Sequence, residues 1–289
     1  MKRIITIQDI SCVGKCSLTV ALPVISAMGV EACVLPTAVL STHTVFKGFT
    51  FRDLTADITP ICNHWKAEGI GFDAIYTGYL GSFEQLDLMG KLFDDFGGGE
   101  TMIIVDPCMA DNGKLYPGFT QEFAFAMAKL SGKADIVIPN MTEASFMLGI
   151  PYRKSGYDVE YVKKIMKDIA ALGAKKVVLK GIEFEANEPE IGNVAGKIGV
   201  ASYDSLTGKF SWYFHEKIPQ NFHGTGDIFA SVFTGAMLRG MTLEKSYALA
   251  ADFVVESIKE TLSHEDHNWY GVDFEAVFPY LWKRLENNN

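Results

Sequence analysis

Short runs rich in isoleucine and valine alternate along the chain with longer amphipathic segments. Such short apolar runs predict buried strands, and the amphipathic segments between them predict helices. When helices connect successive strands, the strands pair in parallel and the helices cover both faces of the sheet. The alternation therefore predicts an α/β fold, a three-layer α/β/α sandwich with a mostly parallel central sheet.

The predicted elements follow this alternation over the whole chain. Strands are expected at 3–7, 32–36, 73–81, 101–107, 135–140 and 175–181. Helices are expected at 17–29, 54–69, 82–97, 119–131, 142–148, 158–172, 226–261 and 273–285. Two alternating segments, GKIGVASYD and GKFSWYFHEKI, predict a hairpin. No repeat, low-complexity tract or linker divides the sequence, so a single domain over 1–289 is expected.

Composition excludes several classes of protein. The net charge is −9 and no basic cluster is present, so a nucleic-acid partner is not expected. The five cysteines are scattered, which is typical of a reducing compartment. Asp9 and Lys15 interrupt the apolar N-terminal stretch, unlike a signal peptide. The apolar segment SLTVALPVISAMGV has only 14 residues and contains Pro23, too short to span a membrane. We expect a soluble cytoplasmic protein.

Polar side chains gather where the predicted strands end. In parallel α/β sheets, ligands bind beyond the carboxyl ends of the strands. The residues expected at these ends are Asp9, Tyr79, Asp106, Asn140 and Lys180. They are therefore candidates for a ligand site.

The tetrad Gly224-Thr225-Gly226-Asp227 precedes a strongly apolar helix. Glycines let backbone N–H groups face outward, and a helix N-terminus adds a partial positive charge, so the turn can bind an anion. Asp227 has two interpretations: an acid that stabilises the helix N-terminus, or a proton acceptor in phosphoryl transfer. The sequence contains no complete Walker P-loop, and the segment 14–17 (GKCS) matches one only partially.

A second group of residues lies in VDPCMAD and PNMTE. Asp106 ends a buried strand, where an acid is either paired or functional. Asn140 and Glu143 are three residues apart at a helix start and can face one side. Mg²⁺ is often held by one or two carboxylates through water while it bridges phosphates, which suits Glu143. The alternative is a capping box formed by Asn140 and Glu143.

Six segments occur in the order found in pyridoxal kinases of the ribokinase superfamily: IQDIS, LSTHT, TGYLGS, VDPCMAD, PNMTE and GTGD. The chain resembles this family over residues 4 to 260. The resemblance implies a ribokinase-like kinase domain that transfers phosphate from ATP to the 5′-hydroxymethyl group of pyridoxal, pyridoxamine or pyridoxine. It also implies Mg²⁺ as a cofactor and a homodimer, and it leaves a monovalent cation open.

The resemblance also implies a role for each matching residue. Asp227 would be the base, and Gly224, Thr225 and Gly226 would form the anion hole. Thr44 would meet the ring hydroxyl of the substrate with His43 beside it, and Tyr79 would pack on the pyridine. Asp106 and Glu143 would work around Mg²⁺ and the phosphates, with Asn140 beside them. Asp111 lies in a loop that faces ATP in relatives, and Lys180 would lie near the phosphates.

Two residues depart from the family pattern. Asp9 stands where relatives usually carry a serine that touches the ring nitrogen, and an acid there could pair with a protonated pyridinium. Ile138 stands where many relatives have a threonine, so one nucleotide contact is in question. Two alternative functions stay open. One is hydroxymethylpyrimidine kinase of thiamine synthesis, and the other is a non-catalytic vitamer-binding protein.

Overall fold

The structure is a computed structural model, and it describes residues 1–286. The chain divides into two compact units. Unit 1 comprises Met1–Tyr79, Asp95–Thr101 and the chain from Ile218 onward, and unit 2 comprises Leu80–Asp94 and Met102–Lys217. The expectation of a single domain stays a prediction, and the two units are described separately.

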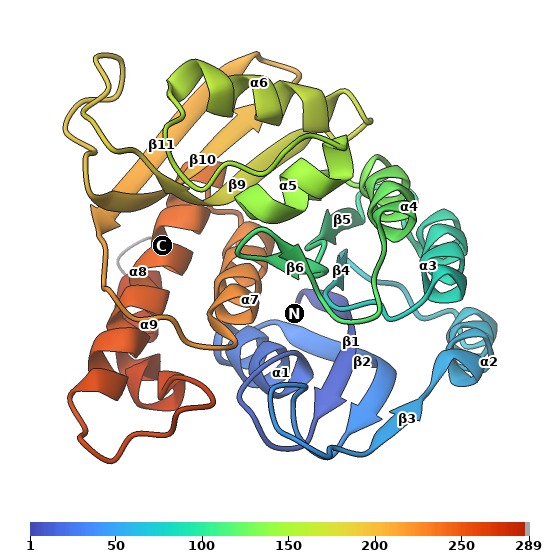
Figure 1. Cartoon of the computed structure of the whole chain (residues 1–289). Helices are drawn as coiled ribbons and strands as arrows, with labels where there is room; N and C mark the ends of the chain where they lie inside the picture. Colours follow the sequence, from blue (N-terminus) through green and yellow to red (C-terminus); the bar gives the residue numbers. More distant parts are fainter. Residues whose placement is uncertain (287–289) are drawn as a thin grey trace. The chain divides into compact units, whose positions relative to one another are not determined.

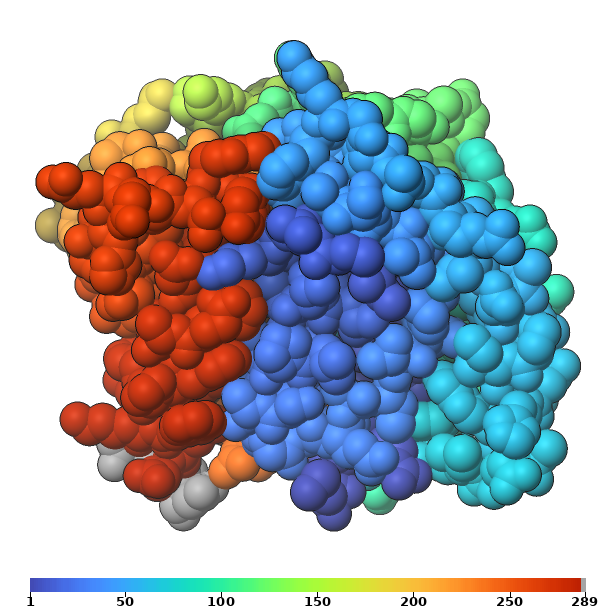
Figure 2. Space-filling model, turned by 90° about the horizontal axis from the view of Figure 1, so that it is seen from below, coloured from blue at the N-terminus to red at the C-terminus, as the bar shows by residue number. Residues whose placement is uncertain are grey.

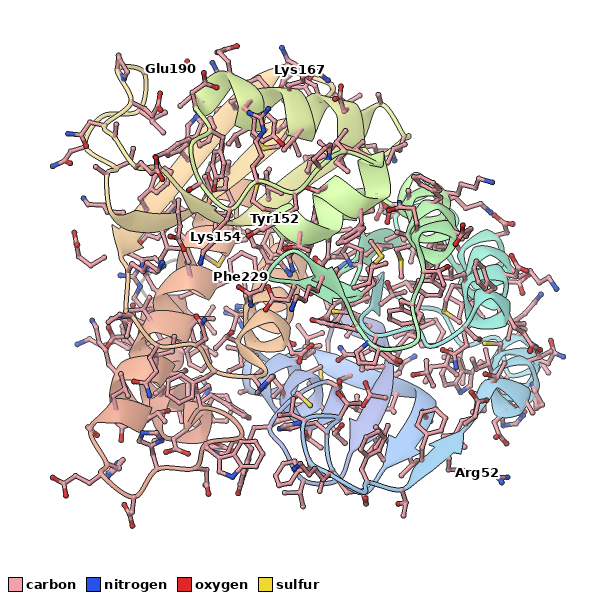
Figure 3. The ribbon with its side chains drawn as sticks, viewed as in Figure 1. Arg52, Tyr152, Lys154, Lys167, Glu190 and Phe229 are labelled. Atoms are coloured by element: carbon pink, nitrogen blue, oxygen red, sulfur yellow. The ribbon has the colours of Figure 1, made fainter. Side chains whose placement is uncertain are left out.

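Unit 1 contains the first four strands, β1 (Arg3–Ser11), β2 (Glu31–Leu40), β3 (Phe51–Asp53) and β4 (Ala74–Thr77). β1 pairs in parallel with both β2 and β4, and β3 pairs antiparallel with β2. β3 is exposed along its length, and Arg52 projects outward from it (Figure 3). A charged side chain on such an edge strand discourages pairing with another chain.

The helices of unit 1 come from both ends of the sequence. They are α1 (Leu18–Ala27), α2 (Thr55–Ala67), α7 (Thr225–Leu238), α8 (Leu243–Leu262), a short 3₁₀ helix (Phe274–Val277) and α9 (Phe278–Glu286). The N-terminal and C-terminal segments lie side by side (Figure 2), and Trp282 donates its indole N–H to the carbonyl of Ala27 at 2.9 Å. α1 packs against α7, where a Cβ on Gly235 would lie 2.4 Å from the sulfur of Met28. A Cβ at this position would have to displace the Met28 side chain, so the glycine allows this close approach.

Unit 2 contains β5 (Met102–Val105), β8 (Ile136–Val137), β9 (Lys176–Glu183), β10 (Lys197–Asp204) and β11 (Lys209–Glu216). β5, β8 and β9 are parallel, and β9, β10 and β11 are antiparallel. Its helices are α3 (Phe83–Phe96, up to Asp94 in this unit), α4 (Gln121–Ser131), α5 (Met141–Leu148) and α6 (Val159–Ala170). α6 packs on β9 and β10 (Figure 1).

A small hairpin, β6 (Ala110–Asp111) and β7 (Lys114–Leu115), follows β5 in unit 2. Its two turn residues, Asn112 and Gly113, have φ angles of 50° and 77°. Asn-Gly is the preferred pair for a tight turn that needs two positive φ angles. The amide N–H of Gly113 donates to the hydroxyl of Thr142 at 3.0 Å, which fixes the hairpin to the start of α5.

The fold class predicted from the sequence is confirmed: an α/β chain with a mostly parallel sheet, flanking helices and a ribokinase-like fold. Several boundaries differ from the prediction. β1 and β2 are longer than expected, whereas β8 is only two residues long. The segment 226–261, which was expected to be helical, contains two helices, separated near Gly240 with a φ of 81°. β3 and the β6–β7 hairpin were not predicted. No described helix is long and apolar enough to cross a membrane.

Candidate active site

The N-terminus of α7 is built around a glycine whose backbone conformation and close contact disfavour any other residue. Gly224 precedes the helix with a φ of 80°, and a Cβ there would lie 2.0 Å from the carbonyl oxygen of Lys15. Gly226 is exposed, and a Cβ on it would meet nothing within 4 Å. The helix that follows is anchored by buried apolar side chains, among them Phe229 (Figure 3). The turn is thus packed against Lys15 at Gly224, whereas Gly226 faces open space.

Asp227 lies in the first turn of α7, and one of its carboxylate oxygens is held by the loop before α1. Its Oδ2 accepts a hydrogen bond from the backbone N–H of Ser17 at 2.9 Å. Ser17 has φ 51° and ψ −131°, and Gly14 and Lys15 also have positive φ. Backbone strain of this kind at non-glycine residues is typical of functional sites. The segment 14–17, only a partial P-loop match in the sequence, therefore lies against the GTGD turn.

The lysine of this loop is engaged in ion pairs within the protein. The ammonium of Lys15 pairs with Asp273 at 2.6 Å and with Glu275 at 3.0 Å. Neither the role of Ser17 nor this pairing was predicted from the sequence. The GKCS sequence was the only sequence signal for this loop. It does not indicate that Ser17 bonds to Asp227, which lies 210 residues away along the chain.

Asp9 belongs to the same cluster as Asp227. Its side chain is 5% exposed, and it accepts a hydrogen bond from the hydroxyl of Ser11 at 3.1 Å. Burial raises the pKa of the Asp9 carboxyl, while hydrogen bonds from the Ser17 and Ser11 side chains act in the opposite direction. Ser17 thus contacts both acids, Asp227 through its backbone and Asp9 through its side chain.

Two further side chains near these acids have raised pKa values. Burial, and then the charge of Asp9, raise the pKa of the Tyr79 hydroxyl. Burial, followed by the charges of Asp227 and Asp9, raises the pKa of the Cys16 thiol to about 12. Of the predicted residues, the structure therefore gathers Asp9, Tyr79 and Asp227 in one cluster. Cys16 is an additional member of it and is a neutral thiol at physiological pH.

His43 and Thr44 lie in another loop of unit 1. His43 is 5% exposed, and its Nδ1 accepts from the backbone N–H of Val45 at 3.2 Å. Its Nε2 lies 3.2 Å from the carbonyl of Tyr270, so the proton resides on Nε2. Burial, and then His223, lower the pKa of the ring. Both nitrogens of His43 are thus engaged with backbone, whereas Thr44 is exposed. Their substrate contacts stay predictions.

Unit 2 holds a buried group of charges at the ends of its parallel strands. The ammonium of Lys180 on β9 contacts both carboxylate oxygens of Asp106, at 2.9 and 3.0 Å. The Asp106 and Lys180 side chains are 1% and 14% exposed. Burial raises the pKa of the Asp106 carboxyl and the Lys180 charge opposes this rise. Burial disfavours the charge of Lys180, yet Asp106 and Glu143 raise its pKa overall.

Asn140 and Glu143 form a capping box, which the sequence spacing predicted as the alternative to a role in binding Mg²⁺. The Oδ1 of Asn140 accepts from the N–H of Glu143, and the Oε2 of Glu143 accepts from the N–H of Asn140, both at 2.8 Å. The amide of Asn140 also donates to the carbonyl of Ala110 at 2.9 Å. This interpretation is confirmed, and the nucleotide roles of both residues stay predictions.

Glu143 has a raised pKa for a capping acid. Its side chain is buried, and its Oε1 lies 3.4 Å from the backbone N–H of Met109. Burial raises the pKa of Glu143 to about 8, with Lys180 opposing and Asp106 adding to the rise. Asp111, in contrast, is exposed and accepts from Asn112 at 2.8 Å. Ile138 is fully buried and offers no hydroxyl to a nucleotide.

The donor set in unit 2 limits how a magnesium ion could bind. Asp106 is paired with Lys180, and Glu143 is bonded to backbone N–H groups. Within residues 1–286, no three His, Cys, Asp or Glu side chains are grouped as metal ligands. Mg²⁺ commonly keeps several waters and takes its other ligands from one or two carboxylates and substrate phosphates. The residues present fit that mode of binding and do not fit an all-protein cage.

The comparisons with known proteins agree with this fold. The family described as phosphomethylpyrimidine kinase matches residues 20–270. A protein of Bacteroides thetaiotaomicron VPI-5482 assigned as a phosphomethylpyrimidine kinase, crystallised with pyridoxal, is 35% identical with a TM-score of 0.90, covering 97% of this chain and 95% of that one. The pyridoxal kinase of Lactobacillus plantarum is 28% identical with a TM-score of 0.86, covering 100% and 99%.

Among curated relatives, the hydroxymethylpyrimidine/phosphomethylpyrimidine kinase of Bacillus subtilis is 25% identical over 197 residues, which is 68% of this chain and 67% of that protein. The chain belongs to the phosphomethylpyrimidine kinase family. It is a kinase, and the resemblance to pyridoxal kinases of the ribokinase superfamily is confirmed.

Proposed function

We propose that the protein transfers the terminal phosphoryl group of ATP to the 5′-hydroxymethyl group of a pyridoxine-class vitamer, which is pyridoxal, pyridoxamine or pyridoxine. The observation that supports this most strongly is the turn before α7. Its anion-binding backbone stands open at Gly226, and Asp227 is held beside it by the N–H of Ser17. An acid and an anion hole in one turn suit the transfer of a phosphoryl group to a hydroxyl.

In this proposal Asp227 orients the hydroxyl and receives its proton late. The N–H of Ser17 and the N-terminus of α7 both stabilise the charged carboxylate, which makes Asp227 a weak base. An alcohol is far less acidic, so its proton does not leave before the phosphoryl group arrives. The hydroxyl oxygen bonds to phosphorus, the bond from phosphorus to the ADP oxygen breaks, and the proton passes to Asp227. The N–H groups of Gly224, Thr225 and Gly226 neutralise the moving phosphoryl oxygens.

In this proposal, polar residues of unit 2 at and near the ends of its parallel strands bind the nucleotide. Asp106, Asp111, Asn140, Glu143 and Lys180 would contact ATP, and Asp106 and Glu143 would hold Mg²⁺ through water. Mg²⁺ would neutralise charge on the phosphate oxygens. A negatively charged ligand near Lys180 would compete with Asp106 for the ammonium. The metal would in turn favour the ionised form of Glu143.

One alternative substrate has a specific observation in its favour. The matching family is described as phosphomethylpyrimidine kinase, and the Bacillus subtilis relative carries a hydroxymethylpyrimidine name. A hydroxymethylpyrimidine presents the same reacting group to Asp227. The presence of Asp106 and Glu143 together with the GTGD turn argues against a non-catalytic vitamer-binding protein. A homodimer in the cytoplasm stays a prediction, as does any monovalent cation.

The experiment is release of ADP by the purified protein with Mg²⁺-ATP and each of pyridoxal, pyridoxamine, pyridoxine and hydroxymethylpyrimidine. We expect release that depends on both Mg²⁺ and a pyridine vitamer. A preference for the pyrimidine would change the proposed substrate and leave the proposed role of the turn before α7 unchanged. A protein that binds a vitamer but releases no ADP would overturn the proposal.

A further inference from the structure

The segment 270–275 follows α8 and is anchored to the core of unit 1. Phe274 is 1% exposed, and the backbone N–H of Asp273 donates to the hydroxyl of Thr261 on α8 at 2.7 Å. Thr261 itself is fully buried. The side chains of Asp273 and Glu275 are 27% and 53% exposed, so they project from an anchored backbone. The segment therefore holds two carboxylates in a defined place.

Both carboxylates bind the ammonium of Lys15, which lies in the loop before α1. The ammonium is 2.6 Å from Asp273 and 3.0 Å from Glu275, and it lies 5.8 Å from the centre of the Phe274 ring. Near the backbone, a Cβ on Gly271 would lie 2.6 Å from the Cβ of Lys15. Burial disfavours the charge of Lys15, yet its hydrogen bonds to Asp273 and Glu275 raise its pKa overall. The lysine side chain thus contacts this segment from its base to its tip.

The loop that contains Lys15 has a disfavoured backbone and a direct link to Asp227. Lys15 and Ser17 have φ angles of 49° and 51°. Residues held in such conformations persist only where the surrounding structure over-determines them. The carbonyl oxygen of Lys15 lies against Gly224. Two residues further on, the N–H of Ser17 donates to the Asp227 carboxylate at 2.9 Å. The ion pairs of Lys15 are therefore among the contacts that hold the hydrogen-bond donor of Asp227 in place.

We propose that Lys15 is a positioning residue for Asp227. Its two ion pairs hold the 14–17 loop in the conformation in which the N–H of Ser17 fixes the Asp227 carboxylate. The lysine charge acts on the loop and not on a substrate phosphate, although the GKCS sequence partially matches a P-loop. This inference rests on the proposed function in the step from Asp227 to turnover, whereas the hold on the loop does not depend on it.

The test compares two ways of breaking the ion pairs. Lys15→Met removes the ammonium and keeps the packing of the side chain, and the double variant Asp273→Asn/Glu275→Gln removes the partners and keeps the lysine. Each should lower kcat with pyridoxine by roughly 10- to 100-fold, because a displacement of about 1 Å caused by a remote change can cost about 10²-fold in rate. The KM for Mg²⁺-ATP should stay unchanged. Lys259→Met breaks an exposed pair with Glu256 on α8 and should leave kcat unchanged.

Two further measurements show whether Lys15 acts through the loop and through Asp227. Exchange of the Ser17 amide proton, followed by NMR without substrate, should be faster in both variants than in wild type or Lys259→Met, because the loop opens more readily. In an Asp227→Asn background, Lys15→Met should lower kcat much less than it does in wild type. Residues that act as one unit have non-additive effects of this kind.

Each outcome separates this inference from the proposed function. If Lys15→Met loses turnover and the double variant keeps it, the lysine acts through its own charge and the inference is overturned. A raised KM for Mg²⁺-ATP with unchanged kcat overturns it as well. If Lys15→Met does not fold, the double variant decides, and wild-type turnover and Ser17 exchange in that variant overturn the inference. If Ser17 exchange accelerates as expected while wild-type protein phosphorylates no vitamer, the hold of Lys15 on the loop stands and the proposed reaction fails.

Discussion

Replacing Gly224 with alanine tests whether the turn before α7 is built as described. A positive φ at a residue with a Cβ costs about 1–2 kcal/mol. The new Cβ would also lie 2.0 Å from the carbonyl oxygen of Lys15. Close contacts of carbon with a carbonyl oxygen are about 3.3 Å, so one of the two segments must move by roughly 1 Å. Forcing extra atoms into a packed position typically costs a further 1–3 kcal/mol.

The sum predicts that Gly224→Ala lowers the free energy of unfolding by about 2–5 kcal/mol. For a chain of this size, Tm should fall by roughly 4–20 °C. Urea denaturation followed by circular dichroism measures the first quantity, and thermal melting measures the second. The displacement also disturbs the Ser17 N–H bond to Asp227, so turnover should fall in the same variant.

Gly226→Ala is the matched control because it changes the same turn by the same atom. A Cβ there meets nothing within 4 Å, and its φ lies outside the left-handed region. We expect its stability to stay within about 0.5 kcal/mol of wild type, or to increase slightly. If Gly224→Ala were as stable as Gly226→Ala, the contact between this turn and the 14–17 loop would be wrong.

The remaining predictions concern the buried charges of unit 2. Lys180→Met leaves the Asp106 carboxylate without its lysine, and urea denaturation should show a loss of about 3–5 kcal/mol. Glu143→Gln keeps the shape and the capping acceptor but removes a titrating group. Because burial raises the pKa of Glu143 to about 8 in the folded protein, wild-type stability should fall as pH rises from about 5 to 8, by at most about 1.4 kcal/mol per pH unit. The glutamine variant should lack that contribution.

A surface ion pair provides the control for Lys180→Met. Lys175→Met breaks an exposed pair with Asp135 just before β9 and should cost less than about 1 kcal/mol. Equal losses in Lys175→Met and Lys180→Met would contradict the burial of the Asp106–Lys180 pair. For Glu143, identical pH profiles of wild type and Glu143→Gln between pH 5 and 8 would show that this carboxyl is already ionised at neutral pH.

The sequence was informative wherever a local pattern determines a local structure. The alternation of apolar runs and amphipathic segments predicted the α/β class, and the tetrad at 224–227 predicted a helix start. Asn140 and Glu143 have the spacing of a capping box, and the structure contains one. β8 stops at Val137, earlier than predicted, because Pro139 cannot donate to a ladder and Asn140 caps the next helix.

The partners of the site residues could not be predicted in the same way. Ser17 and Asp227 are 210 residues apart, and their bond depends on a loop with positive φ at two non-glycine residues. Local preferences disfavour that conformation, so no pattern points to it. The pairing of Asp106 with Lys180 links positions 74 apart, and only the adjacency of strands in the folded sheet brings them together.

The central claim is that Asp227 acts on the hydroxymethyl group of the substrate, and Asp227→Asn tests it most directly. Asparagine can still accept the bond from Ser17, so folding and Tm should be unchanged. The measurement is the rate at which phosphate ester forms from pyridoxine and Mg²⁺-ATP, followed by phosphorus NMR. Loss of a general base predicts a kcat about 10²–10⁴-fold lower with pyridoxine binding retained. A turnover close to wild type in a well-folded Asp227→Asn would remove Asp227 from the chemistry.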